Sequence, residues 1–479
     1  MRIWNTLSGR KEELEKTAGR PLRLFVCGPT VYDYAHIGHA RTYVVFDAFV
    51  RYLRRKGWSV FYLQNLTNVD DKIIVRAREE NKNPLELARF FVKTYLDDMR
   101  DLGVISVDKY APASGFIRDI ERQIGTLREK GYAYEIPGDG IYYDISKFAD
   151  YGKLSHRTAE EAEDGVSRID ESVRKRNRGD FCLWKFPKRP AKPNFFQNLR
   201  GFFVNGDGEL VWKTGLGWGR PGWHIEDTAI TEHYFGPQYD VHGAAADLKF
   251  PHHEAEIAQQ EAASGKKPLV KIWMHAGFLT INGKKMSKSL KNLVSIRDAL
   301  REHSSAVLRW FFLSAHYRTP MDYSPENLRQ IRVVHSRVRI FMEKLDYAIG
   351  PENPENNQKA AGAVRLAKEG FDNALDDDFN TPLAIASLLG LIAEIQENLW
   401  ETGTNGLVSI RDFLKGSFET LGIPIKPEPV PEKAVKMAAE RELCRANKQF
   451  AQSDALREKI RVLGYSIEDT PRGPFVFKE

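Results

Sequence analysis

Two short motifs that lie far apart in the sequence carry side chains suited to bind a polyphosphate. His36 and His39 follow an apolar run and a Gly-Pro-Thr turn, where the pattern predicts that a helix begins. The first N–H groups of a helix attract anions, and histidines there donate hydrogen bonds to phosphate oxygens. Lys285 and Lys288 follow an Asn-Gly turn, and a mobile loop would bring both to a β- or γ-phosphate. Together the motifs predict a nucleotide held from two sides, although each alone is more typical of a helix cap or a solvated basic loop.

A third group of residues has spacing suited to a metal ion. His252 and Glu256 are four residues apart in a helical pattern, so both side chains lie on one face. Cys27 ends the first predicted strand, which is where open α/β sheets place their ligand sites. By themselves, His252 and Glu256 are more typical of a surface ion pair, and Cys27 of a buried inert thiol. A zinc-protease motif on His253 fails, because the residue four positions later is Ile257.

The elements that must position these side chains are those of an α/β protein. Residues 22–27 read as a buried strand, and a helical pattern follows over 37–56 with Gly57 as its C-cap. A second strand begins at Val60. A strand, a crossover helix and a strand predict that a parallel sheet opens the protein.

A chain of 479 residues is too long for one hydrophobic core. The pattern divides it into a first half of a Rossmann-like domain (1–107), an insertion (108–218), the second half of that domain (219–323), a helical region (324–423), and a linker with a small terminal module (424–479). Finer features include a hairpin around the turn at 137–140, sheet-like sequence resuming near Gly222, a helix from about Pro251, a linker over 424–431, a helical stretch over 434–463 and a hairpin over 465–477.

Composition bounds the class of protein. Hydrophobic residues make up 42% and charged residues 28%, and no stretch reads as the roughly 18 uncharged apolar residues of a membrane span. The N-terminus lacks the apolar core of a signal peptide, so we expect a cytoplasmic protein without a membrane. The three cysteines argue against a disulfide framework. A net charge of +6 permits RNA as a partner without requiring it.

Further segments accompany these motifs in a fixed order. They are 27–33, 36–39, 65–72, 180–185, 219–226, 250–254, 256–259, 285–289, 371–382, 445–447 and 454–457. In these segments the chain resembles class I cysteinyl-tRNA synthetases over nearly its whole length. The resemblance implies a catalytic domain whose insertion is the connective peptide, a helical domain that contacts the tRNA stem, and an anticodon-binding module at the C-terminal end. It leaves open the role of residues 186–217.

The resemblance also implies an activity. Enzymes of this family activate L-cysteine with ATP, supplied as Mg-ATP, and pass the cysteinyl group from the adenylate to the 3′ end of tRNA(Cys). Positioning and charge stabilisation carry the reaction. By position in the motifs, the implied catalytic residues are His36, His39, Lys285 and Lys288; the implied ATP-binding residues are Gly38, Gly243, Asp247 and Lys288; and the implied cysteine-binding residues are Thr67 and Trp223. The family is commonly monomeric.

Discrimination against serine implies a zinc ion, because zinc binds a thiolate far better than a hydroxyl. The implied ligands are Cys27, Asp227, His252 and Glu256, and Asp227 stands where the family has a second cysteine. A carboxylate is an acceptable zinc ligand, but it makes the site harder and leaves the identity of the metal open.

Two further places in the chain depart from the family pattern. Ala244 and Ala245 stand in what the family makes a glycine-rich turn near adenosine, and Lys291 stands where glycine is common. Two alternatives therefore stay open beside a cysteine–tRNA ligase. One is a ligase that joins cysteine to a small amine, which the long C-terminal region disfavours. The other is a non-catalytic tRNA-binding paralogue, which the intact phosphate motifs disfavour.

Overall fold

The computed structural model describes residues 1–157, 174–189, 192–193, 201–286, 290, 292–350 and 357–478. These residues form two compact units. The first comprises Met1–Glu302 with Tyr317–Asp322, and the second comprises His303–His316 with Tyr323–Glu479. The finer domain boundaries expected from the sequence stay predictions.

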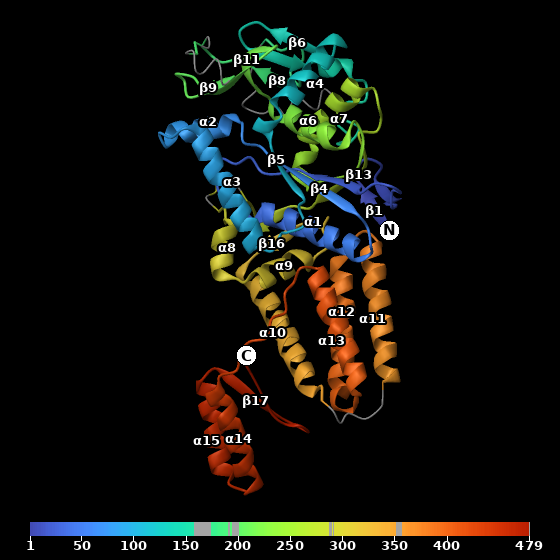
Figure 1. Cartoon of the computed structure of the whole chain (residues 1–479), viewed down its shortest axis with the longest axis vertical. Coiled ribbons are helices and arrows are strands. Elements are labelled where there is room, and N and C mark those ends of the chain that lie inside the picture. The colour runs from blue at the N-terminus through green and yellow to red at the C-terminus, as the bar shows by residue number, and fades with distance from the viewer. Residues whose placement is uncertain are drawn as a thin grey trace. The chain divides into compact units, whose positions relative to one another are not determined.

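A five-stranded parallel sheet forms the centre of the first unit (Figure 1). Its strands, in spatial order, are β13 (Val270–Ala276), β12 (Tyr239–Ala245), β3 (Leu22–Val26), β4 (Val60–Leu66) and β5 (Lys109–Pro112). Leu22 pairs with Val60 across β3 and β4, with α1 (Ile37–Arg55) as the crossover, so the predicted βαβ unit is confirmed. On its other side β3 pairs with β12, which comes more than 200 residues later. Ligands of open α/β sheets bind at such a reversal of strand order, at the carboxyl ends of the strands.

Local chemistry accounts for the helices that flank the first strands. Gly57 follows the C-cap Lys56 at φ 73°, a left-handed conformation that glycine adopts without strain, so the predicted glycine stop is confirmed one residue beyond the cap. The Asp70 carboxylate accepts a hydrogen bond from the Lys72 backbone N–H at 2.7 Å and caps α2 (Asp71–Glu79). Both elements border the edge of the sheet where Cys27 lies.

The insertion is a separate six-stranded antiparallel sheet in the order β6-β7-β8-β11-β10-β9. Its strands are β6 (Ala133–Ile136), β7 (Gly140–Tyr143), β8 (Phe181–Lys185), β9 (Phe202–Val204), β10 (Leu210–Thr214) and β11 (Gly217–Pro221). The predicted hairpin is β6 with β7. Residues 186–217 supply β9 and β10, so this segment completes the inserted sheet. The parallel sheet continues past residue 108, because β5 still pairs with β4.

One expectation near Gly222 was wrong. Instead of sheet-like sequence, α6 (Trp223–Phe235) begins there, and β12 follows it. The helix is buried from His224 to Thr231 on every side, so it lacks the apolar stripe from which a helix is normally predicted. The helix expected from about Pro251 is α7 (His252–Ser264). The remaining elements of the first unit are β1 (Arg2–Asn5), β2 (Arg10–Glu13), α3 (Pro84–Asp101), η1 (Ala113–Gly115), α4 (Ile117–Glu129), η2 (Ile145–Lys147), η4 (Ala246–Lys249), β14 (Leu279–Ile281), β15 (Lys284–Lys285), α8 (Ile296–Glu302) and most of β16 (Met321–Tyr323).

The second unit is helical, as the pattern beyond Ser324 predicts. It contains α9 (Ser305–Leu313), α10 (Pro325–Ala348), α11 (Gln358–Asp376), α12 (Thr381–Asn398), η5 (Leu399–Glu401) and α13 (Thr404–Thr420), with α11 packed against both α12 and α13. Among the described residues, one helical segment, Thr381–Glu401, is long and apolar enough to cross a membrane by length and composition alone, although it carries glutamates such as Glu394. Its buried residues recur at the spacing of a bundle helix, from Ala384 through Leu388 and Leu391 to Ile395, which is the pattern of a helix packed in a protein core.

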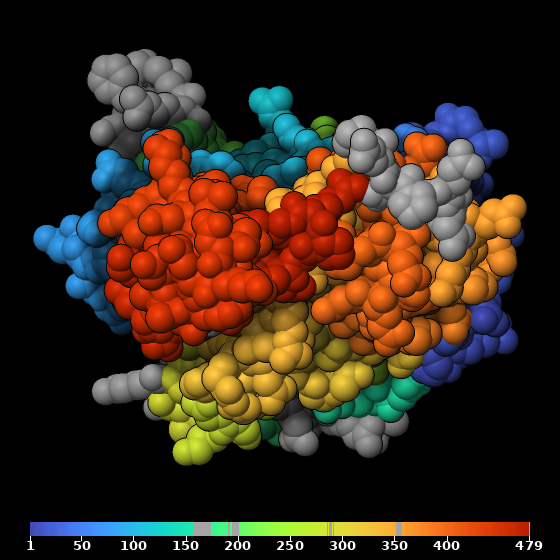
Figure 2. Space-filling model, turned by 90° about the horizontal axis from the view of Figure 1, so that it is seen from below, coloured from blue at the N-terminus to red at the C-terminus, as the bar shows by residue number. Residues whose placement is uncertain are grey.

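The C-terminal end forms a small module of two helices and a hairpin. Residues 424–431 lack helix and strand, as expected of a linker. The helical stretch after them is two helices, α14 (Glu432–Ala446) and α15 (Phe450–Val462), separated at Lys448 by a left-handed backbone with φ 57°. The predicted hairpin is β17 (Tyr465–Thr470) with β18 (Gly473–Lys478). Figure 2 shows the surface of the two helices in orange-red and of the hairpin in red.

Candidate active site and metal centre

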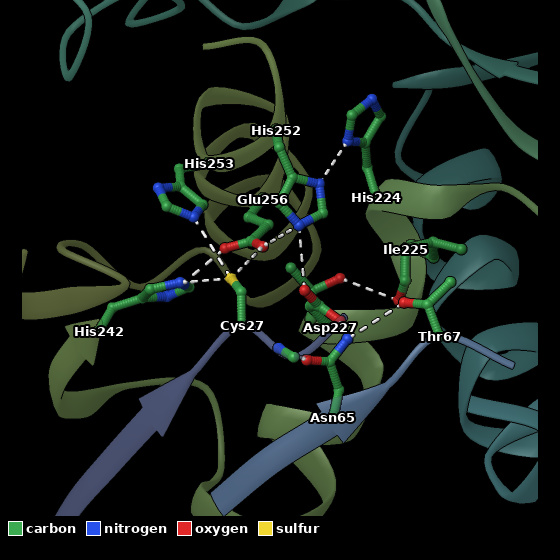
Figure 3. A network of polar contacts seen from close by, with 12 residues as sticks. Cys27, Asn65, Thr67, His224, Ile225, Asp227, His242, His252, His253 and Glu256 are labelled. Atoms are coloured by element: carbon green, nitrogen blue, oxygen red, sulfur yellow. Dashed lines mark hydrogen bonds and ion pairs between the residues drawn. The ribbon is translucent and has the colours of Figure 1, made fainter. Parts of the chain in front are cut away.

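Cys27 lies at the carboxyl end of β3, where side chains from three other elements converge on it (Figure 3). Its Sγ lies 3.1 Å from Nε2 of His242 on β12 and 3.3 Å from Nε2 of His253 on α7. It also lies 4.0 Å from Oε1 of Glu256. Burial first, and then the carboxylates of Glu256 and Asp227, raise the pKa of the Cys27 thiol well above its usual value. A thiolate at this position therefore requires a compensating cation.

Asp227, His252 and Glu256 form the other side of the cluster. Nε2 of His252 lies 3.0 Å from Oδ2 of Asp227 and 3.0 Å from Oε1 of Glu256. The four-residue spacing of His252 and Glu256 on α7 thus makes a buried pair, not the surface ion pair that the spacing alone favours. Burial opposes the charge on His252, but the carboxylates of Glu256 and Asp227 outweigh it and raise its pKa to about 9.

Two overlapping sets of four side chains have the composition of a metal site. One is Cys27, Asp227, His252 and Glu256, and the other is Cys27, His242, His253 and Glu256; within each set, one ligand atom from every residue lies within 4.8 Å of the others. Sulfur, imidazole and carboxylate donors in a buried tetrad fit a zinc ion. Two carboxylates and a thiol lie close together in this buried cluster, and a bound cation would offset the repulsion between their negative charges. The residues therefore fit such an ion.

The imidazoles of the cluster are held by partners on their far side. His242 Nδ1 lies 2.7 Å from the Tyr239 hydroxyl, and His253 Nδ1 lies 2.9 Å from His275 Nε2. His252 Nδ1 lies 2.8 Å from His224 Nδ1. Such outer contacts orient a histidine toward a metal or a thiolate.

Trp223 and Thr67, the residues expected to bind cysteine, lie on the Asp227 side. The Trp223 ring stacks on His252 with centroids 4.2 Å apart and planes at 14°. The Asn65 amide donates to the Thr67 hydroxyl at 3.3 Å and also to Asp227 Oδ1. Trp223 therefore contacts the metal cluster directly, whereas Thr67 is linked to it through Asn65.

His36 and His39 lie at the start of α1. Their rings stack with centroids 3.8 Å apart, and the His36 backbone N–H donates to Nδ1 of His39 at 3.3 Å. Burial first, and then His36, lower the pKa of His39 well below its usual value, so His39 is neutral at pH 7. Because Nδ1 accepts a hydrogen bond, the ring proton is on Nε2, which leaves Nε2–H as a donor.

The lysine motif begins beside this helix start. Asn282 and Gly283 turn the β14–β15 hairpin with φ of 49° and 73°, as the predicted Asn-Gly turn requires. A Cβ added to Gly38 would lie 2.8 Å from Cε of Met286, so the two motifs adjoin at these residues. The backbone of Lys285 ends β15, whereas Lys288 and Lys291 lie outside the described residues.

The segment expected to be a glycine-rich turn is instead the end of a strand. Gly243, Ala244 and Ala245 belong to β12 and pair with Met274, His275 and Ala276 of β13, so the expectation of a turn was wrong. The methyl group of Ala244 is buried within the sheet. Asp247 follows in η4, where it is exposed.

We expect Gly243→Ala to destabilise the first unit. The added Cβ would lie 2.3 Å from a ring carbon of Phe46, which is fully buried on α1. Overpacking of this kind costs about 1–3 kcal/mol in free energy of unfolding. Urea denaturation measures the change, with Gly125→Ala on α4 as the control, because an added Cβ there meets nothing within 4 Å. An unchanged midpoint for Gly243→Ala would contradict the tight packing.

Comparison with known proteins identifies the family. The family described as the catalytic domain of class I (C) tRNA synthetases matches residues 13–333, and the DALR domain matches residues 370–426. A cysteine–tRNA ligase of Thermococcus gammatolerans is 41% identical over 99% of this chain and 98% of its own length. The chain belongs to the cysteine–tRNA ligase family. A member of this family from Coxiella burnetii is 40% identical over 99% of both chains.

Solved structures share the fold of this cysteine–tRNA ligase family member. A LeuRS of Agrobacterium radiobacter, solved with tRNA and LeuAMS, has a TM-score of 0.62 at 12% identity and covers 85% of this chain and 84% of its own. A methionyl-tRNA synthetase of Mycobacterium tuberculosis has a TM-score of 0.56 at 13% identity and covers 84% of this chain and 90% of its own. The expected class I fold, with a Rossmann-like sheet followed by a helical region, is thus confirmed.

Sequence reasoning missed several side chains of the cluster. His224, His242 and His253 contact the predicted ligands, yet they come from three different elements. The predicted Tyr-Asp-Val-His strand held a signal for His242, because a histidine within a buried strand needs a polar partner nearby. The sequence alone does not reveal that β12 lies beside β3.

Proposed function

We propose that this chain activates L-cysteine with ATP and transfers the cysteinyl group to the 3′ end of tRNA(Cys). The observation that carries the proposal is the buried tetrad of Cys27, Asp227, His252 and Glu256, found at the ligand edge of the sheet in a member of the cysteine–tRNA ligase family. Thiol selection is the distinctive problem for such an enzyme, because serine is nearly isosteric with cysteine and shape alone rejects it poorly.

We assign the metal to the tetrad that includes Asp227, and we propose zinc as its identity. When bound there, zinc would act as a Lewis acid that prefers a thiolate to a hydroxyl. The choice of this tetrad over Cys27, His242, His253 and Glu256 is supported by Trp223 and Thr67, which line the Asp227 side. On this assignment, His242 and His253 are not metal ligands but orient Cys27 through contacts to its sulfur.

Adenylate formation requires groups that hold ATP at the entry of α1. We propose that His36 and His39 bind the triphosphate as the substrate carboxylate attacks the α-phosphorus, with pyrophosphate leaving. Lys285 and Lys288 would bind the β- and γ-phosphates, and Gly38 allows close approach of the backbone. Gly243 and Asp247 are proposed near the adenosine. Preorganised donors of this kind stabilise the developing charge without enzyme-bound covalent intermediates.

For tRNA, we propose that the second unit supplies the contacts. The match to the DALR domain and the alignment with relatives over nearly the whole chain favour tRNA over a small amine as acceptor. Among the exposed apolar side chains of α14 and α15, the Phe450 ring suits the stacking of an unpaired base, and Leu443 and Val462 offer apolar contact. A monomer in the cytoplasm remains our prediction.

ATP–pyrophosphate exchange tests the proposal directly. We expect exchange that depends on cysteine and is at least about 100-fold slower with serine at equal concentration. Charging of tRNA(Cys) transcript, followed on acid gels, tests the second step. Folded, zinc-loaded protein that binds tRNA but catalyses neither step would favour a non-catalytic paralogue, and exchange without charging would favour another acceptor.

A further inference from the structure

One buried carboxyl group beside the proposed cysteine pocket has no hydrogen-bond partner in the part of the chain that the structure describes. Glu226 is 0% exposed, and neither of its carboxylate oxygens has a hydrogen bond of acceptable geometry among the described residues. The Thr67 hydroxyl lies near the Glu226 carboxyl group. Buried polar atoms are satisfied in the great majority of cases, and an orphaned one needs an explanation.

The position of Glu226 on α6 directs it toward the site. Trp223, Glu226 and Asp227 stand at positions i, i+3 and i+4 of one helix, so they share a face. Trp223 stacks on His252, and Asp227 contacts both His252 and Asn65. The Glu226 carboxyl therefore belongs to the same wall as the groups that we assign to the metal and to the substrate.

The surroundings of Glu226 select the charge of what it binds. The carboxylates of Asp227 and Asp70 are charged neighbours of Glu226. A cation that entered between these acids would be attracted to them, whereas another anion would be repelled and a neutral apolar group would leave the buried oxygens of Glu226 without partners. A small group with several N–H donors would satisfy both orphaned oxygens.

We propose that Glu226 binds the α-ammonium group of the cysteine substrate. This inference rests on the proposed function, because it assumes that the substrate thiol is bound beside Asp227. In cysteine the nitrogen and the sulfur are separated by three single bonds, or roughly 3–4 Å. Adjacent residues of one helix wall, Asp227 on the metal side and Glu226 beside it, suit two groups that are this close. Asp227, through the metal, and Glu226 would then recognise the thiol and the ammonium group of the same cysteine.

Matched ligands and a near-isosteric variant test the proposal. 3-Mercaptopropionate keeps the thiol and the carboxylate of cysteine but lacks the ammonium group. We expect Glu226→Gln to weaken binding of cysteine by about 10- to 100-fold, the usual size for a charged hydrogen bond, and binding of 3-mercaptopropionate by less than about threefold. Isothermal titration of zinc-loaded protein measures both affinities. Glu232→Gln, the same change six residues further along α6, should alter neither.

The outcomes separate this inference from the proposed function. Equal weakening of both ligands, or no change for cysteine, would overturn the role of Glu226. Partial recovery of cysteine binding in Glu226→Asp, with zinc content intact, would support it. If the wild-type protein binds neither thiol ligand, the proposed function itself fails, whatever the behaviour of the variant.

Discussion

Replacing Asp227 with alanine should strip most of the metal from the protein. Asp227 Oδ2 lies 3.0 Å from His252 Nε2 within a tetrad whose ligand atoms are all within 4.8 Å, so its loss leaves three donors and an opening. Loss of an outer-shell partner alone typically weakens metal binding by about 10–100-fold, and we expect loss of a direct ligand to exceed that. Elemental analysis after dialysis against a weak chelator measures zinc per chain, and circular dichroism verifies that the variant is folded.

The same variant should also lose its preference for cysteine over serine. Without a metal, the pocket distinguishes a thiol from a hydroxyl only by size and polarity, for which discrimination is roughly 100-fold or less. We expect the ratio of kcat/KM for the two amino acids in pyrophosphate exchange to fall by at least about tenfold, mostly through slower reaction with cysteine.

Asp227→Cys provides the matched control. It restores a fourth ligand and changes oxygen to the softer sulfur, so we expect zinc to be held at least as tightly as in the wild type. Full zinc content in Asp227→Ala would show that Asp227 is not a ligand. In that case His253→Gln should release the metal, because the alternative tetrad of Cys27, His242, His253 and Glu256 would be the occupied one.

The fold was predictable where a local pattern matched a local structure. The buried run of β3, the periodic face of α1 and the Gly57 cap together made the first βαβ unit readable. Helix α6 was not, because it is buried on all sides and its pattern lacks a polar face. The family resemblance predicts a turn at Ala244 and Ala245, whereas pairing with β13 keeps both residues in a strand.

The site was predictable from spacing only in part. The sequence pattern alone places His252 and Glu256 on one helix face and Cys27 at a strand end, and the structure has them there. Asp227 is predicted only by the family resemblance, since nothing in its own neighbourhood marks it as a ligand. His242 reaches Cys27 only because Val241 pairs with Leu24 across β12 and β3, a contact more than 200 residues apart. Single-sequence patterns do not encode such long-range pairings.

Replacing His39 with asparagine should slow adenylate formation by about 100- to 1,000-fold, the usual cost of removing one preorganised donor to a developing charge. His39 is neutral at pH 7, because burial and His36 keep its pKa well below the usual range. Its Nδ1 accepts the His36 backbone N–H, so its Nε2–H is the group that can donate to a phosphate oxygen. Cysteine-dependent pyrophosphate exchange measures the loss. The pKa of His39 in the folded protein is lowered. The wild-type rate should therefore not fall through protonation of His39 until the pH is well below the ordinary pKa of histidine.

Two controls separate this role of His39 from the metal site and from a general loss of structure. His233→Asn changes a half-exposed histidine that pairs with Asp119 at 3.4 Å, and it should leave exchange unaltered. Zinc content and cysteine binding should be the same in His39→Asn as in the wild type, because His39 belongs to neither candidate tetrad. A loss of metal together with activity would mean that the start of α1 supports the metal cluster structurally. If pyrophosphate exchange by His39→Asn stays within about threefold of the wild-type rate, His36 and His39 only cap the helix, and other groups bind the phosphates.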